Sequence, residues 1–172
     1  LNLLRNDLEV VNMRGNIDTR IKKLKNKEYD AIVLSLAGIQ MLDLNNEVKE
    51  VFTTKQILPA LGQGVIALQC KKDDNKILNI LKFVNDKNTF HCVEAERALL
   101  AAIGGDCDTA IGGLAELSND IISLRSELFS NDGKKKFEFQ DSGNCKEAKE
   151  IGYRVGEELL KRAGSSFTVQ GR

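Results

Sequence analysis

Residues 109–140 read TAIGGLAELSNDIISLRSELFSNDGKKKFEFQ, a stretch in which apolar and polar side chains largely alternate. A period of two is typical of strands with one buried face. The polar runs Ser118-Asn119-Asp120 and Asn131-Asp132-Gly133 have the composition of tight turns. The stretch therefore predicts an antiparallel meander with strands over residues 109–117, 121–129 and 134–140.

Helical patterns flank this meander on both sides. One helix is expected from about Thr89 to Ile103, ending at Gly104-Gly105, because glycine commonly stops a helix. A shorter helix before it has Asp73 or Asp74 as its cap. Ala148, Ile151, Val155 and Leu159 mark a last amphipathic helix. We expect a small α+β domain whose sheet is covered by helices on one face.

A cysteine lies in the loop between the first of these helices and the sheet. Cys107 is framed by Gly104-Gly105 and Gly112-Gly113, and glycines let a bulky ligand approach closely. The helix C-terminus and two neighbouring aspartates disfavour a thiolate, so Cys107 does not resemble a turnover nucleophile. A strong electrophile could still alkylate it once and leave a thioether that anchors a prosthetic group. The alternative is a small buried cysteine in a turn.

The first sixty residues show a different pattern. Strands are expected over residues 8–13 and 31–36, with a helix from about Ile17 to Lys27 between them, which together form a βαβ unit. Arg14 and Gly15 then lie at the carboxyl end of the first strand, where such units bind ligands, and Arg20 is one turn into the helix. Pairing of both arginines with surface carboxylates is the alternative.

A further strand is expected over residues 65–70, after Pro59 and the hinge-like Gly62-Gln63-Gly64.

The chain has 172 residues, and its 25 basic and 25 acidic side chains cancel, so no global field attracts nucleic acid or an anionic membrane. The longest apolar run is too short to cross a bilayer. Four cysteines without a C-x-x-C pair and a single histidine argue against zinc and disulfides, which favours a reducing cytosol.

Several motifs occur in order along the chain and together resemble the porphobilinogen deaminase, or hydroxymethylbilane synthase, family. They are Arg14-Gly15-Asn16-Ile17-Asp18-Thr19-Arg20, residues 28–34 with Ala37-Gly38, Leu58-Pro59-Ala60-Leu61-Gly62-Gln63-Gly64, Glu94-Ala95-Glu96-Arg97-Ala98 and Gly105-Asp106-Cys107. The resemblance is carried by residues 12 to about 117; beyond that only the pattern of elements matches.

The resemblance implies a cytoplasmic, monomeric enzyme of heme and other tetrapyrrole (porphyrin) synthesis. Such a transferase joins four porphobilinogen molecules head to tail into hydroxymethylbilane and releases ammonia at each step. A dipyrromethane cofactor would be attached to Cys107 as a thioether. Arg14 and Arg20, with Gly15, would bind the carboxylates of the cofactor and of the growing polypyrrole chain, since guanidinium pairs with two carboxylate oxygens. Gln63 would line the same cleft.

The same resemblance divides the chain into parts. Residues 1–58 would be the later part of a periplasmic-binding-protein-like parallel α/β domain, residues 59–76 a hinge and strand that return to the first domain, and residues 77–172 the C-terminal domain. The first domain, with its catalytic aspartate, is expected to be missing, so this chain alone is expected to be inactive.

The sequence departs from the family pattern at two further positions, and other functions compete with the resemblance. Met41 stands where an arginine is usual and Ala110 where a proline is usual. One competing hypothesis is a non-catalytic module that captures small carboxylates through Arg14 and Arg20. Another is a thiol enzyme that uses Cys107 with His91, disfavoured because the two lie near opposite ends of a helix about 18 Å long.

Overall fold

The computed structural model describes residues 1–105 and 109–168, so the prediction for Cys107 falls outside the described residues. The chain forms two compact units, Leu1–Thr53 and Thr54–Arg172, each of which is described by itself. Unit 1 contains α1 (Ile17–Lys25), α2 (Leu36–Met41) and the 3-10 turn η1 (Asn45–Glu47). Unit 2 contains α3 (Asn75–Leu81), α4 (Lys87–Ile103), β1 (Ile111–Ser118), β2 (Ile121–Phe129), β3 (Lys136–Asn144), η2 (Cys145–Glu147), α5 (Ala148–Ala163) and η3 (Gly164–Ser166).

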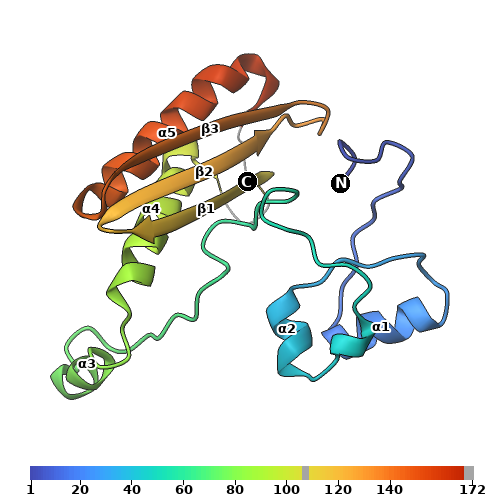
Figure 1. The fold of residues 1–172 in the computed structure, drawn as a ribbon, viewed down its shortest axis with the longest axis horizontal. Helices are drawn as coiled ribbons and strands as arrows, with labels where there is room; N and C mark the ends of the chain where they lie inside the picture. Colours follow the sequence, from blue (N-terminus) through green and yellow to red (C-terminus); the bar gives the residue numbers. More distant parts are fainter. Residues whose placement is uncertain (106–108, 169–172) are drawn as a thin grey trace. The chain divides into compact units, whose positions relative to one another are not determined.

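The expected meander is confirmed in unit 2. The three strands pair antiparallel in the order β1-β2-β3 (Figure 1). Asn119 and Asp120 join β1 to β2 with φ values of 48° and 62°, a left-handed pair that suits a two-residue hairpin loop. Gly133 turns the chain toward β3 with a φ of 67°. The turn residues therefore set the register that the alternating pattern requires.

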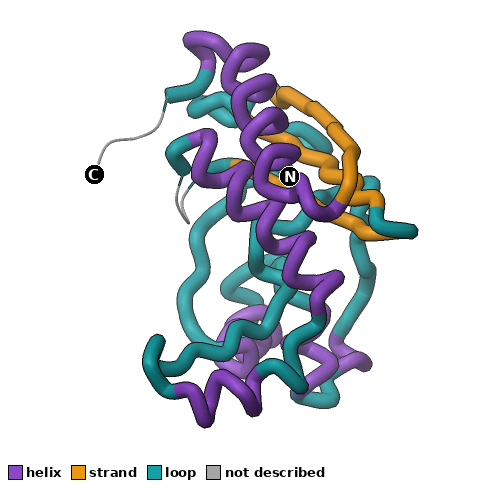
Figure 2. The backbone as a smooth tube through the Cα atoms, turned by 90° about the vertical axis from the view of Figure 1, so that its left-hand side faces the viewer, coloured by secondary structure: helices purple, strands orange, loops and turns teal. Residues whose placement is uncertain are grey.

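Helices α4 and α5 cover one face of this sheet, as expected. Figure 2 shows the two helices side by side on one side of the strands. Leu99 of α4, Ile122 and Leu124 of β2, and Ile151 and Leu159 of α5 are fully buried in the shared core. The mixed helix-and-sheet class is thus confirmed, and the core of unit 2 lies between the helices and one sheet face.

Two glycines of α5 allow it to approach α4 closely. A Cβ atom on Gly152 would lie 2.2 Å from the Ala95 carbonyl oxygen, and one on Gly156 would lie 2.5 Å from the Ala102 Cβ. The first contact is with backbone, which cannot swing aside as a side chain can. The two helices therefore pack at a distance that only glycine permits at residue 152.

Caps fix the ends of the helices near the sheet. The Asp86 carboxylate accepts a hydrogen bond from Thr89 N at 2.6 Å and begins α4. Gly104, with a φ of 71°, ends that helix as expected. Asp74 caps α3 by accepting from Ile77 N at 3.0 Å, which settles the choice between Asp73 and Asp74.

The strands expected over residues 8–13, 31–36 and 65–70 are wrong. These segments are described throughout, and none of them is assigned as a strand. Parallel strands persist only when neighbouring strands satisfy their backbone and other layers cover both faces. In unit 1 only Ile21 and Ile39 are buried hydrophobic residues, whereas Val10 and Val33 are more than half exposed. These runs are apolar, but no sheet in the described residues includes them.

Candidate functional site

The Arg14-to-Arg20 motif forms the N-terminal end of α1. The Arg20 Nε atom donates a hydrogen bond to the Gly15 carbonyl oxygen at 2.7 Å, so the side chain folds back toward the start of its own helix. Gly15 has a φ of +120°, a conformation that L side chains rarely adopt, and a Cβ atom there would also crowd Thr19 at 3.3 Å. Glycine is therefore required to make the turn that Arg20 contacts.

Both arginines keep donors for a ligand. Arg14 is exposed and has no partner among the described residues, and only the Nε atom of Arg20 is engaged by a described group. In the described part of the chain neither guanidinium pairs with a carboxylate, in contrast to the surface ion pairs that were the alternative. Charged, open guanidinium groups are the donor set that suits an anionic, carboxylate-rich group. Met41, where the resemblance predicts an arginine, is 86% exposed and adds no charge.

The Ala37-Gly38 motif packs α2 against α1. Ser35 caps α2, its hydroxyl accepting from Gly38 N at 3.3 Å. A Cβ atom on Gly38 would come within 2.5 Å of the Ile17 Cδ1 atom. The motif thus supports the helix that carries Arg20.

In unit 2 the Leu58-to-Gly64 motif covers the free edge of β1. The Pro59 carbonyl oxygen accepts a hydrogen bond from Gly113 N at 2.9 Å. Gly62, with a φ of 69°, then turns the chain, and Gln63 N donates to the Ala60 carbonyl oxygen at 3.4 Å. An edge strand exposes unpaired N–H groups, and this segment satisfies one of them. The Gln63 side chain is exposed beyond the turn.

The glycines around Cys107 have a role that the sequence alone did not reveal. A Cβ atom on Gly113 would lie 2.4 Å from the Leu61 side chain, and one on Gly112 would lie 3.0 Å from the Leu58 Cβ and 3.2 Å from its carbonyl oxygen. On Gly105 it would meet Thr109 at 2.8 Å. Ligand access was the reason inferred for these glycines, and the described contacts instead assign them to close packing of the chain on itself.

A buried carboxylate joins the same segments. Glu96 of α4 is only 8% exposed, and its two oxygens accept hydrogen bonds from Gly62 N at 2.7 Å and Ala115 N at 3.0 Å. It therefore ties the helix to both the covering segment and β1. Sequence reasoning missed this role, although a glutamate between Ala95 and Leu99 on the apolar face of a helix was a usable signal of a partnered buried charge.

The segment that contains Cys107 joins two described ends that touch each other. Gly105 and Thr109 are close enough that a Cβ atom on Gly105 would collide with the Thr109 side chain. Thr109 in turn accepts from Ile111 N at 2.8 Å, at the start of β1. The described residues on either side of the predicted attachment point thus lie at the end of α4 and at the start of β1.

A second thiol lies in a cavity of about 450 Å³ next to Glu96. Burial raises the pKa of the Cys92 thiol, and the negative charges of Glu96, Asp86 and Glu116 raise it further. His91, one residue earlier, places its Nδ1 atom 3.7 Å from the Glu94 carboxylate. Cys92 is therefore a protonated, weakly reactive thiol, unlike an activated nucleophile.

The described part of the chain offers neither a metal centre nor a membrane-spanning helix. No group of three or more His, Cys, Asp or Glu side chains there could hold a metal ion. No helix over residues 1–105 or 109–168 has the length and apolar content needed to span a bilayer.

In a comparison with known families, the chain matches two domain models of one enzyme, one after the other along the sequence. Residues 1–79 match "Porphobilinogen deaminase, dipyromethane cofactor binding domain", and residues 90–161 match "Porphobilinogen deaminase, C-terminal domain". The chain belongs to the porphobilinogen deaminase family. Arg14, Gly15, Arg20 and Gln63 fall within the first match, and Cys107 falls within the second.

Curated relatives named porphobilinogen deaminase agree with this assignment. One from Coxiella burnetii is 39% identical over 159 residues, which are 92% of this chain and 52% of the relative. A relative from Syntrophomonas wolfei is 34% identical, and the match covers 98% of this chain and 55% of the relative. One from a Roseiflexus species is 38% identical, and the match covers 97% of this chain and 55% of the relative. The chain thus spans about half the length of these relatives.

Proposed function

We propose that this chain supplies the cofactor-carrying part of a hydroxymethylbilane synthase. The complete enzyme condenses four porphobilinogen molecules head to tail and releases one ammonia at each step. The observation that carries this proposal is the ordered match of two domains of one enzyme across residues 1–79 and 90–161. The relatives are about twice as long as this chain, which supports its assignment to part of a longer enzyme.

The residue roles follow from the chemistry of an acid-rich ligand. Each pyrrole unit bears an acetate and a propionate, so a cofactor and a growing chain need fixed cations. Arg14 offers an unengaged guanidinium, and Arg20 offers its terminal nitrogens while its Nε atom holds Gly15. Gln63, exposed beyond its turn, offers an amide donor to the same ligand.

Cys107 is the attachment residue in this proposal. The Cys107 sulfur forms a bond to a pyrrolic methylene carbon while the carbon–nitrogen bond breaks, and ammonia leaves with the thiol proton. When bound, the dipyrromethane group supplies the free pyrrole position that each new substrate extends. The two arginines hold its acid groups, and Cys107 keeps it covalently in place.

The remaining roles belong to parts of the enzyme beyond this sequence. A positioned acid must protonate the leaving amine, and a carboxylate must stabilise the developing cation. The family aspartate with that role has no counterpart here, so residues 1–172 by themselves are expected to turn over no porphobilinogen. We assign residues 1–58 to the second domain, 59–76 to a hinge segment that returns to the first domain, and 77–172 to the C-terminal domain. We assign the complete enzyme to the cytoplasm, as a monomer that binds neither nucleic acid nor membrane.

Intact-mass measurement of the purified chain, incubated with porphobilinogen and the complementary half of a relative, tests the attachment. We expect an added mass equal to two linked pyrroles, and we expect Cys107→Ser to abolish it. Cys70→Ser is the matched control and should retain the addition, since Cys70 is accessible but lies outside every site motif. Addition at another cysteine, or none in a complemented and active sample, contradicts the role of Cys107.

The arginines are tested by the same reconstituted enzyme. Arg14→Gln and Arg20→Gln should each lower turnover by at least tenfold, because a lost charge-assisted carboxylate contact is worth roughly 1.5–3 kcal/mol. Arg154→Gln removes an arginine that pairs with Asp141 within unit 2 and should leave turnover unchanged. Equal turnover in all three variants would contradict the assigned roles, and simple carboxylate binding without turnover would favour the non-catalytic alternative.

A further inference from the structure

The outer edge of β3 is the free edge of the sheet in unit 2. The strands pair in the order β1-β2-β3, so β3 pairs with β2 on one side, and no strand of the described residues pairs with its other side. The Ser126 hydroxyl of β2 donates to the Phe139 carbonyl oxygen at 2.6 Å, which places that carbonyl toward β2. In an antiparallel pair the carbonyls of successive residues point in opposite directions, so the Glu138 carbonyl points to the free edge.

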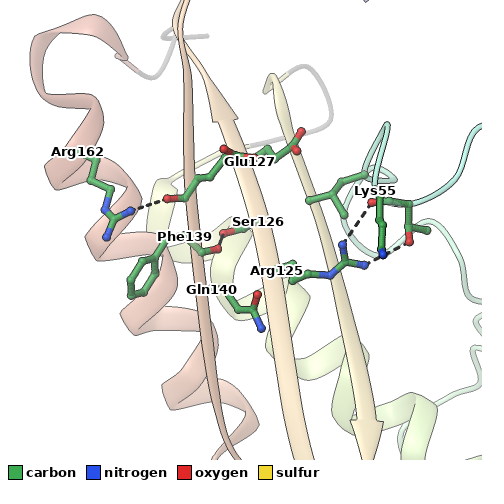
Figure 3. A pocket seen from close by; sticks show the side chains of 10 residues that line it. Lys55, Arg125, Ser126, Glu127, Phe139, Gln140 and Arg162 are labelled. Atoms are coloured by element: carbon green, nitrogen blue, oxygen red, sulfur yellow. Dashed lines mark hydrogen bonds between the residues drawn. The ribbon is translucent and has the colours of Figure 1, made fainter.

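Arg162 of α5 occupies this edge. Its Nη1 atom donates to the Glu138 carbonyl oxygen at 2.6 Å, and its Nε atom donates to the Glu158 carboxylate at 2.8 Å. Its guanidinium carbon lies 4.6 Å from the centre of the Phe139 ring, within the range of a cation–π contact. Figure 3 shows the side chain reaching from the helix to β3 beside Phe139, where both residues line a pocket of about 390 Å³. These three contacts hold the guanidinium at the edge of the strand.

The guanidinium stands where the N–H group of another strand would have to lie. A backbone nitrogen that pairs with a carbonyl comes to about 2.9 Å from its oxygen. The Arg162 Nη1 atom already lies at 2.6 Å from the Glu138 oxygen, on the open side of the strand. Charged side chains at a sheet edge are one way in which proteins prevent pairing with another chain. A second strand can therefore pair with β3 at this point only after Arg162 moves away.

The sequence of β3 suits pairing with a second copy of itself. Every second residue of the strand directs its backbone groups to the free edge together with Glu138. This set consists of Lys136, Glu138, Gln140, Ser142 and Asn144. In an antiparallel register centred on Gln140 the set pairs with itself. Lys136 then faces the amide of Asn144 and the acidic Glu138 faces a serine, so no like charges lie opposite each other.

We propose that the free edge of β3 is a self-pairing surface of this chain and that Arg162 keeps it closed. The occupant that fits the edge is β3 of a second copy, related by a twofold axis at Gln140. Such pairing uses the one sheet edge that is free in the described residues, because the Leu58-to-Gly64 segment lies along the edge of β1. The assembly therefore closes as a dimer, whose continuous sheet joins the three strands of each copy, and does not extend into a filament.

Sedimentation velocity of the full chain, from low micromolar to submillimolar concentration, tests the proposal without cofactor or substrate. Wild type should remain monomeric across this range. In Arg162→Ala each dimer gains two hydrogen bonds, one to each Glu138 carbonyl, so its dissociation constant should be at least about tenfold below that of wild type. The Arg162 side chain is 44% exposed and alanine favours a helix, so α5 is retained. Arg162→Lys keeps a charged donor and should stay close to wild type.

Two further variants keep the result specific. Arg154 also reaches from α5 to β3, but it binds the Asp141 carboxylate at 2.8 Å and not a backbone carbonyl, so Arg154→Ala should leave association unchanged. Gln140→Pro, added to Arg162→Ala, removes the N–H group at the proposed twofold axis. That N–H faces the free edge and takes no part in pairing with β2, so the double variant should fold and return to the monomer.

Hydrogen exchange of Arg162→Ala gives an independent measurement. Exchange at the Gln140 amide should slow as the chain concentration rises, because this N–H group pairs only in the dimer. An Arg162→Ala chain that associates no more strongly than wild type or Arg154→Ala would overturn the proposal. So would oligomers larger than a dimer, or protection of the Gln140 amide in the monomer, which would mean that another segment of the chain covers the edge. None of these outcomes depends on Cys107.

Discussion

Loss of the Glu96 side chain should destabilise unit 2. Replacing it with alanine removes acceptors from Gly62 N and Ala115 N, which it holds at 2.7 Å and 3.0 Å. A buried N–H left without a partner costs about 1–3 kcal/mol, with the larger figure expected at the more buried Ala115. The variant no longer buries a carboxylate, and this gain offsets part of the cost of the two unpaired N–H groups. We expect a net loss of about 2–3 kcal/mol.

Glu96→Gln separates the two contacts. A glutamine oxygen can still accept from one N–H group, but its amide nitrogen then faces the other N–H as a second donor. We therefore expect a loss of about 1–2 kcal/mol, intermediate between wild type and Glu96→Ala. The gradation would show that acceptor chemistry, and not side-chain volume, makes the position sensitive.

Urea unfolding followed by far-UV circular dichroism measures the effect, because most of the helix belongs to unit 2. At a typical slope of about 1–3 kcal/mol per molar urea, Glu96→Ala should lower the midpoint by about 1–2 M. Hydrogen exchange should show faster exchange at Gly62 and Ala115 before the rest of the sheet. Glu94→Ala, two residues away on α4 and engaged only in partly exposed ion pairs, is the control and should lose less than about 1 kcal/mol. Similar midpoints for Glu96→Ala and Glu94→Ala would refute the reasoning.

Three further outcomes follow from the described contacts. Gly152→Ala should cost about 2–3 kcal/mol in thermal or urea unfolding because its Cβ would strike α4 backbone, whereas the exposed Glu157→Ala on the same helix should stay within about 0.5 kcal/mol. The raised pKa of Cys92 stabilises the folded chain while the thiol is protonated, so stability should fall as pH rises above the ordinary thiol value of 9.0, and Cys92→Ser should remove that slope in unfolding experiments. The hydrogen bond from Thr89 N lowers the pKa of Asp86, so the stabilisation that this carboxylate gives α4 is present near neutral pH and is lost on acidification. In Asp86→Asn the unfolding midpoint should therefore fall less steeply as the pH is lowered.

The sheet domain could be predicted from sequence because its signals are local. Alternation along residues 111–129, a left-handed Asn119-Asp120 turn and the Gly104 helix stop all act over a few residues, and they agree with one another. The same is true of the start of α1, where Gly15 and Arg20 are five residues apart and form one turn. Each of these features needs only neighbours in the chain.

Features that depend on distant partners could not be predicted in the same way. The apolar run at residues 31–36 has the composition of a buried strand, but composition cannot supply the neighbouring strand that would pair with it. The apolar neighbours of Glu96 indicate that it is buried, but they do not identify Gly62 and Ala115 as the groups that donate to it. In both cases the deciding group lies many residues away.

The glycines beside Cys107 show why this distinction matters for function. Read alone, Gly112 and Gly113 suggest open space for a ligand, yet Leu58 and Leu61 occupy that space and bring the hinge segment against β1. The same glycines therefore link the strand that follows the cysteine to the segment that carries Gln63. A side chain at Gly113 would push the hinge segment off the sheet edge and leave the Gly113 N–H unpaired. A mutation at Gly113 should therefore disturb β1 and the hinge segment together, because one packing contact holds both.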